Sequence, residues 1–210
     1  MDELKRAFRN RLPRFQNEVD FLVSAVLLPI VIVNDEPHVL FEVRAENLKR
    51  QPGEICFPGG MVEQSEFDNP MEAAVREATE ELGIEREQIE VIGQLDYCIS
   101  LTGILIYPYV GMIARPDQIV PNPGEVGEVF LVPVKFFLTN EPYHSRVEVS
   151  TRFVEGFPFH CIPQSYKKGW QLRGTTTVYF YKYKDRIIWG ATAGILHNFV
   201  SICHNIKYWQ

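Results

Sequence analysis

Apolar and polar positions divide the chain into short segments, most of which have the period of strands. The longest apolar run is "FLVSAVLLPIVIV" at residues 21–33, which is too short to cross a bilayer and contains Pro29. It therefore predicts a buried strand. The turn cluster "NDEP" follows, and "HVLFEVRA" then predicts a second strand. We expect the two strands to pair as a hairpin.

Further segments downstream have the composition of strands. Residues 89–99 and 104–114 are rich in β-branched or aromatic side chains, which favour extended structure. A loop rich in Pro, Gly and Asn at residues 115–125 leads to the strand-like "VFLVP". Residues 143–155 and 175–189 predict additional strands.

Two segments near the ends of the sequence have helical spacing. Leu4, Phe8 and Leu12 recur every four residues, which predicts a short amphipathic helix that ends at Pro13. From Ala193 onward the apolar residues again follow helical spacing. This pattern predicts a helix packed on the sheet.

Residues 70–83 predict a helix with one buried face. Pro70 suits the first helical position, and Gly83 suits the position just past the end. Asp68 or Asn69 is expected to cap the start of the helix through its side chain. The apolar residues of the segment form a stripe along one side: Met71, Ala74, Val75, Ala78 and Leu82.

Three glutamates crowd one turn of this predicted helix. Glu77, Glu80 and Glu81 lie at positions i, i+3 and i+4, where like charges repel by a few tenths of a kcal/mol per pair. A solvated acidic face explains such a cluster, but "FPGG" at residues 57–60 offers a backbone that a ligand approaches closely. Carboxylate and carbonyl oxygens are the ligands that Mg²⁺ prefers. We therefore predict a divalent metal site.

Composition narrows the class of protein. The chain has 210 residues, is 46% hydrophobic and carries a net charge of −6, which predicts one domain and argues against broad nucleic-acid binding. Its start lacks the apolar core of a signal peptide, so we expect neither export nor a membrane. Four scattered cysteines favour a reducing cytoplasm over a disulfide framework or zinc site, and the five histidines show no ligand spacing.

Gly60, Glu66 and "REATEELGI" at residues 76–84 resemble the Nudix box. That box runs Gly, five residues, Glu, seven residues, then Arg-Glu-apolar-any-Glu-Glu-any-Gly-apolar. The second half matches fully. Nine residues instead of seven follow Glu66 before the arginine, and Glu63 or Asp68 are alternatives for its supporting role.

Residues 40–60 resemble the segment that precedes the box in Nudix coenzyme A pyrophosphatases. Arg44 and "FPGG" fit that pattern, whereas Glu42, Ala45 and Lys49 stand where the subgroup has Thr, Ser and Arg. Shorter segments after the box also look like this subgroup.

The resemblance implies an α/β fold, specifically an α/β/α sandwich around a mixed β-sheet. It implies one Nudix domain over residues 1–210, with residues 1–20 as an N-terminal helical extension. Residues 156–172 match no segment of the subgroup and are left as a loop or insertion.

The resemblance also implies the reaction and the residues that carry it. A nucleoside diphosphate linked to another group is hydrolysed with Mg²⁺ or Mn²⁺, and coenzyme A would give 3′,5′-ADP and 4′-phosphopantetheine. Glu77, Glu80 and Glu81 are then metal ligands, together with the carbonyl of Gly60. Arg76 orients the carboxylates.

Other roles have more than one candidate. The general base is a box glutamate or Glu125 from a later loop, with Glu128 as the rival. Arg44, Lys49 and Arg50 are candidates for contact with the substrate's phosphates, since cationic side chains suit phosphate oxygens. The competing functions are a Nudix hydrolase for another substrate, such as ADP-ribose or NADH, and a catalytically silent binding module. The oligomeric state stays open.

Overall fold

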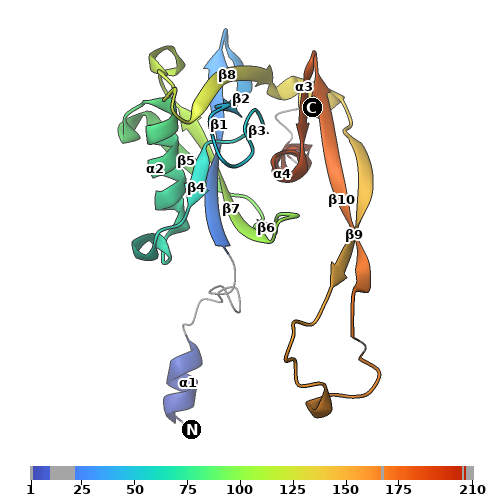
Figure 1. Ribbon diagram of the computed structural model, residues 1–210. Helices are drawn as coiled ribbons and strands as arrows, with labels where there is room; N and C mark the ends of the chain where they lie inside the picture. Colours follow the sequence, from blue (N-terminus) through green and yellow to red (C-terminus); the bar gives the residue numbers. More distant parts are fainter. Residues whose placement is uncertain (1, 10–21, 167, 205, 207–210) are drawn as a thin grey trace.

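A mixed β-sheet forms the centre of the molecule (Figure 1). The computed structural model describes residues 2–9, 22–166, 168–204 and 206. The path of the sheet is β3-β2-β1-β7-β5, and β4, β6 and β8 add to β1, β7 and β2. Its strands are β1 (Leu22–Val33), β2 (Glu36–Arg44), β3 (Ile55–Cys56), β4 (Gly59–Met61), β5 (Ile89–Gln94), β6 (Cys98–Ile99), β7 (Ile104–Ile113) and β8 (Val126–Pro133).

The predicted hairpin at the start of this sheet is confirmed. β1 and β2 pair antiparallel, with Ile30 opposite Val39. The turn residues Asn34 and Asp35 both have positive φ, at 50° and 63°, as a tight two-residue hairpin turn requires. β1 also pairs in parallel with β7, so the sheet is mixed.

Helix α2 (Pro70–Leu82) covers one face of the sheet, as predicted. Ala74 and Ala78 pack with Ala25 and Leu27 of β1 in one buried cluster. The helix begins at a proline and ends at Gly83, which has a left-handed φ of 62°. The expected side-chain cap is wrong, because the N-cap residue donates to the Glu72 side chain at 3.3 Å instead of binding the backbone.

The opposite face is covered by α3 (Val134–Thr139) and α4 (Gly190–His204). Leu196 and Phe199 of α4 share a buried cluster with Leu28 of β1 and Phe41 of β2. Helices therefore lie on both faces of a mixed sheet, which confirms the α/β/α sandwich. Within the described residues, the body and arm also contain the single-turn 3-10 helices η2 (Gln64–Glu66), η3 (Arg86–Gln88), η4 (Pro116–Gln118) and η5 (Phe159–Cys161).

A second, three-stranded sheet packs on the far side of α4 (Figure 1). It consists of β9 (Tyr143–Thr151), β10 (Gln171–Tyr183) and β11 (Arg186–Trp189). The predicted strand 143–155 thus stops earlier, at Thr151. The predicted strand 175–189 starts earlier, at Gln171, and is split by a turn at residues 184–185, where Lys184 has a positive φ of 54°.

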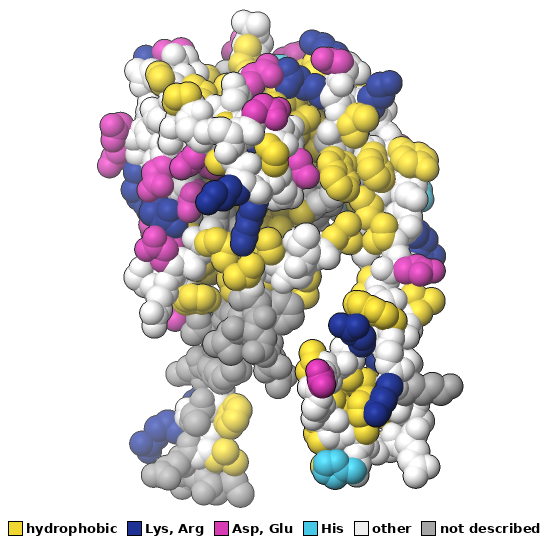
Figure 2. Space-filling model, in the orientation of Figure 1, with side chains coloured by type: hydrophobic (Ala, Val, Ile, Leu, Met, Phe, Trp, Pro, Cys, Tyr) yellow, Lys and Arg dark blue, Asp and Glu magenta, His cyan; other side chains and the backbone are white. Residues whose placement is uncertain are grey.

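Strands β9 and β10 extend well beyond the body as a long arm (Figure 1). The segment that matched nothing in the sequence, residues 156–172, lies at the far end of this arm. Phe153 and Phe157 pack there with their ring centroids 4.2 Å apart. In Figure 2 the arm's far end mixes hydrophobic and basic side chains, whereas acidic ones gather over the part of the body that holds α2.

The predicted N-terminal helix is present as α1 (Asp2–Arg9). Leu4 and Phe8 are exposed on it, and the expected end at Pro13 lies outside the described residues. Across the part of the chain that the structure describes, no helix is both long and apolar enough to span a membrane.

Candidate active site

Two adjacent glycines bring the backbone of β4 against α2. Gly60 pairs with Ala25 of β1, and a Cβ atom at Gly60 would collide with the carboxyl group of Glu77. A Cβ atom at Gly59 would lie 2.5 Å from the carbonyl oxygen of Ala25. Glycine is thus required at Gly59 by the approach of the backbone, whereas a side chain at Gly60 would displace the carboxyl group of Glu77. The carbonyl of Gly60, a predicted metal ligand, accepts a hydrogen bond from Ser24 Oγ at 2.8 Å.

Arg76 connects the carboxylates of the site. Its Nε donates to Glu66 Oε1 at 2.9 Å and its Nη1 donates to Glu77 Oε1 at 2.8 Å, while Glu80 Oε2 lies 3.8 Å from Nη1. Glu66 also accepts from the backbone N–H of Glu63 at 2.8 Å. The two extra residues after Glu66 therefore leave its contact with the box arginine intact, and Glu63 supports Glu66 rather than replacing it.

The three box glutamates differ in their surroundings. Glu81 is only 5% exposed and accepts the backbone N–H of Gly59 at 2.8 Å, whereas the Glu80 side chain is 57% exposed. Burial raises the pKa of Glu81 to about 7, against the opposing hydrogen bond from Gly59. Burial also raises the pKa of Glu77. Glu81 therefore differs from Glu80 in its burial, although the two glutamates are neighbours on the helix.

The structure places a fourth carboxyl group, Glu42, against Glu81. It lies opposite Cys56 in the β2–β3 pair, is 1% exposed, and its Oε1 has no hydrogen-bond partner. Burial, followed by the charge of Glu81, raises the pKa of Glu42 well above its ordinary value, and burial raises the pKa of Cys56 to about 12. In the sequence, Glu42 stands out only as a departure from the coenzyme A pattern. The signal that would have found it is a glutamate inside an otherwise buried strand.

The two candidates for the distant carboxylate are separated by their contacts. Glu125 lies in the turn before β8 and raises the pKa of Glu42, Glu77 and Glu81 as a contributing charge. Glu128 instead pairs with Arg186 at 2.7 Å. Glu125 therefore belongs electrostatically to the carboxylate cluster, and Glu128 is held by another partner.

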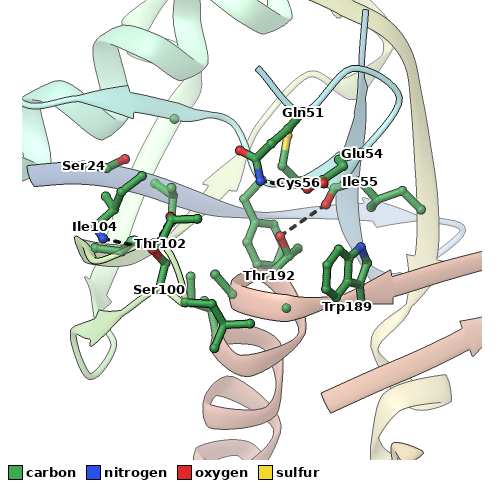
Figure 3. A pocket seen from close by; sticks show the side chains of 18 of the residues that line it. Ser24, Gln51, Glu54, Ile55, Cys56, Ser100, Thr102, Ile104, Trp189 and Thr192 are labelled. Carbon is green, nitrogen blue, oxygen red and sulfur yellow. Dashed lines mark hydrogen bonds between the residues drawn. The ribbon is translucent and has the colours of Figure 1, made fainter. Parts of the chain in front are cut away.

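The three predicted phosphate-binding residues lie at the end of β2 and in the loop after it. Arg44 lines a cavity together with Gln51 and Glu54 (Figure 3). Its Nε donates to the carbonyl oxygen of Arg50 at 3.5 Å. Lys49 and Arg50 are exposed beside it. Arg44 also lowers the pKa of both Glu42 and Glu81 as an opposing charge, so it is the candidate closest to the carboxylates.

The donor set fits a hard divalent cation by its chemistry. Carboxylates of the box lie beside a backbone carbonyl at Gly60, and Glu42 contributes a buried oxygen atom without a partner. These are the oxygen ligands that Mg²⁺ and Mn²⁺ take. Within the described residues, no three His, Cys, Asp or Glu side chains lie close enough to hold a metal as they stand. Binding of a cation therefore requires these carboxylates to draw closer together than they stand here.

Comparison with known proteins matches this geometry to a family. A model of the NUDIX domain covers residues 24–150. The chain is 36% identical over 138 residues to the mouse peroxisomal coenzyme A diphosphatase NUDT7, an alignment that covers 66% of this chain and 57% of the mouse protein. It therefore spans less than two thirds of that relative.

Two further proteins are similar to this chain. Over 174 residues the chain is 35% identical to the Nudix hydrolase NudL of Photorhabdus laumondii, covering 83% of this chain and 81% of that one. The crystal structure of the Nudix hydrolase RenU from M. smegmatis aligns with a TM-score of 0.46 and 26% identity, covering 55% of this chain and 73% of the other.

Proposed function

This chain belongs to the Nudix family, and from that premise we propose that it hydrolyses the pyrophosphate bond of coenzyme A or an acyl-coenzyme A. The products would be 3′,5′-ADP and 4′-phosphopantetheine or its acyl derivative. The observation that carries the proposal is the fork of Arg76, which holds Glu66 and Glu77 beside the Gly59–Gly60 backbone. A silent binding module has no need of this arrangement.

A divalent cation, Mg²⁺ or Mn²⁺, supplies charge neutralisation at the pyrophosphate and lowers the pKa of a water molecule when bound. Glu77, Glu80 and Glu81 are the side chains that would hold it, with the carbonyl of Gly60. Arg76 fixes the direction of Glu77. Ser24 fixes the carbonyl of Gly60.

The remaining candidate residues accept a proton from the attacking water or contact the substrate's phosphates. Glu125 is our candidate to accept a proton from the attacking water, since it lies near the carboxylate cluster and no ion pair with Arg186 holds it. Arg44 offers a cation next to the same cluster, and guanidinium groups suit phosphate oxygens. Lys49 and Arg50 add positive charge on the solvent-exposed side of Arg44, where they would contact the 3′-phosphate of the substrate.

The choice of coenzyme A among Nudix substrates rests on two supports. Arg44 and the "FPGG" segment keep their places in the coenzyme A pattern, and the mouse relative carries the name of a coenzyme A diphosphatase. We further propose that residues 1–210 act as one domain, because a single buried cluster joins β1, α4 and Tyr181 of the second sheet. A cytoplasmic location stays a prediction from the cysteine spacing.

The test is product analysis with purified protein, coenzyme A and either Mg²⁺ or Mn²⁺. Chromatography should resolve 3′,5′-ADP and 4′-phosphopantetheine, and EDTA should stop the reaction. ADP-ribose and NADH serve as competing substrates in the same assay. Comparable or higher kcat/KM on either one would reject the coenzyme A assignment and leave the Nudix chemistry in place. Tight binding of a nucleotide without turnover would instead favour the binding module.

A further inference from the structure

Two adjoining cavities lie on the α4 side of the main sheet. The proximal cavity, of about 240 Å³, runs from Gly59 and Arg44 to Trp189 and Thr192 (Figure 3). The distal cavity, of about 280 Å³, lies between β6, β10 and α4 and reaches Asn198. The residues that line both are Ser100, Leu101, Gly190, Ala191 and Ile195. The two cavities therefore adjoin each other, and the proximal one reaches Gly59 beside the carboxylate site.

The proximal cavity meets the site at Gly59. The N–H of this residue donates to Glu81, and the residue itself lines the cavity. Thr192 Oγ1 at the start of α4 donates to the carbonyl of Ile55 at 3.2 Å, which closes one wall against β3 (Figure 3). A substrate whose pyrophosphate lies at Gly59–Gly60 can therefore extend into this cavity.

The distal cavity has the wrong charge for the nucleotide half of coenzyme A. Among the described residues that line it there is no Lys or Arg, and Asp96 adds a carboxylate. The half that carries 3′- and 5′-phosphates needs cations nearby. The pantetheine half is uncharged beyond its phosphate, so this half suits the path.

Large apolar side chains are exposed around the distal cavity. Tyr97, Ile99 and Leu101 line it, and they are 59%, 50% and 55% exposed. Clustered exposed apolar side chains at the rim of a cavity mark a site for an apolar ligand. An aliphatic chain bound there would remove these side chains from water.

We propose that the distal cavity binds the acyl chain of an acyl-coenzyme A, with pantetheine passing through the proximal cavity. This inference rests on the proposed function. It adds a site for the acyl chain, which is the part of the substrate that determines which acyl-coenzyme A is preferred. Each buried methylene contributes about 0.8 kcal/mol. We therefore expect kcat/KM to rise at least about tenfold from acetyl- to octanoyl-coenzyme A, which corresponds to partial burial of the added methylenes.

Gly194 provides a variant that fills the distal cavity without disturbing the fold. It lies on α4 and lines only the distal cavity, and an added Cβ would meet nothing within 4 Å. Leucine is also a better helix former than glycine. In Gly194→Leu the ratio of kcat/KM for octanoyl- over acetyl-coenzyme A should fall at least about fivefold, while the melting temperature holds. Gly93→Leu is the matched control, because Gly93 also has open space and lies outside both cavities.

The outcomes separate the two proposals. If coenzyme A is hydrolysed but chain length has no effect, or if Gly194→Leu leaves the ratio unchanged, the acyl site is wrong and the proposed function stands. If no coenzyme A derivative is hydrolysed, the proposed function fails, and a binding measurement then tests the acyl site. Octanoyl-pantetheine, which lacks the pyrophosphate, should then raise the melting temperature of the wild type more than that of Gly194→Leu. Equal shifts would overturn the acyl site.

Discussion

The backbone N–H of Gly59 donates to Oε2 of Glu81 over 2.8 Å, and this bond ties the box helix to the glycine pair of β4. Glu81 is thereby held in a buried position where an ionised carboxylate has little water. The neighbouring glutamates of this turn therefore differ mainly in burial, because Glu81 is shielded from solvent and Glu80 is exposed.

The buried Glu81 predicts a pH-dependent stability of the metal-free protein. A carboxyl group whose folded pKa of about 7 exceeds its unfolded value of 4.5 keeps its proton in the folded state after the unfolded chain has lost it. The contribution of Glu81 to the free energy of unfolding should therefore fall as pH rises from about 4.5 to about 7 and level off above that. Urea denaturation in EDTA between pH 5 and pH 8 measures this slope.

Glu81→Gln should flatten that slope. The amide oxygen still accepts from Gly59, but the group no longer ionises, so the variant should be more stable than wild type above pH 7 by a few kcal/mol. Glu80→Gln is the matched control, since the exposed Glu80 should change stability by less than about 0.5 kcal/mol. Equal slopes in wild type and Glu81→Gln would show that Glu81 is not the titrating group.

Melting with and without Mn²⁺, measured beside activity, should show whether Glu81 is a metal ligand. Excess Mn²⁺ should raise the melting temperature of the wild type, because a ligand that binds only the folded state stabilises it by mass action. Glu81→Gln should lose this shift and nearly all activity. Normal turnover with a normal Mn²⁺ shift would remove Glu81 from the set of metal ligands.

Gly60→Ala should displace the Glu77 carboxyl group. The added Cβ would occupy the space that the carboxyl group fills, so we expect kcat to drop about tenfold or more, equivalent to at least ~1.4 kcal/mol. Gly93→Ala is the control, since a Cβ there meets no atom within 4 Å. Steady-state kinetics of the two variants provide the comparison. An active Gly60→Ala would mean that Glu77 need not stay against this backbone.

Arg76→Lys should show what the forked guanidinium does. Lysine keeps the charge but cannot reach Glu66 and Glu77 at once, and hydrogen bonds to charged groups are worth about 1.5–3 kcal/mol each. We expect kcat to fall about tenfold and the Mn²⁺ affinity to weaken. The control, Arg86→Lys, alters an exposed pair with Glu72 and should leave both quantities unchanged. Similar kinetics for the two variants would make Arg76 an ordinary surface partner.

Glu125 and Glu128 form a natural pair for testing the proton acceptor. Glu125→Gln should lower kcat by at least about tenfold, as expected when a general base is removed. Glu128→Gln breaks only the ion pair with Arg186 and should cost less than about 1 kcal/mol of stability. The reverse pattern would move the role to Glu128.

Lys49 and Arg50 should affect the binding of substrates that carry the 3′-phosphate. Both side chains are exposed after β2, so Lys49→Ala or Arg50→Ala should raise KM for coenzyme A severalfold more than for dephospho-coenzyme A, which lacks that phosphate. The salt dependence of KM should weaken with it. Equal changes for both substrates would show that neither residue contacts the 3′-phosphate.

Local pattern was enough to predict the elements that carry the site. Pro70 and Gly83 delimit α2 because each is adapted to one end of a helix, and the apolar stripe between them selects the buried face. The hairpin of β1 and β2 followed from two apolar runs and a two-residue turn at Asn34. These features depend on residues close together in the sequence.

Features that depend on distant residues were not predicted. Glu42 contacts Glu81 only because β2 and α2 meet through the sheet, and no local pattern reveals that meeting. The arm of β9 and β10 was missed for a related reason, since residues 156–172 have aromatic rings that pack among themselves and not on the core. The second sheet was not predicted as a separate sheet, because composition indicates which segments are strands but not which strands pair.

The parallel pairing of β1 with β7 has a consequence for how the protein folds. Residues 22–30 join residues 104–112, and everything from the glycine pair to the box helix lies in the loop between them. Closing so long a loop is an entropic barrier that local contacts do not repay. The helix packs on Ala25 and Leu27 of β1, and it gains Leu105 of β7 only after that closure. A nascent chain that has not yet emerged to β7 thus contains the whole box sequence without the complete surface on which the box helix packs.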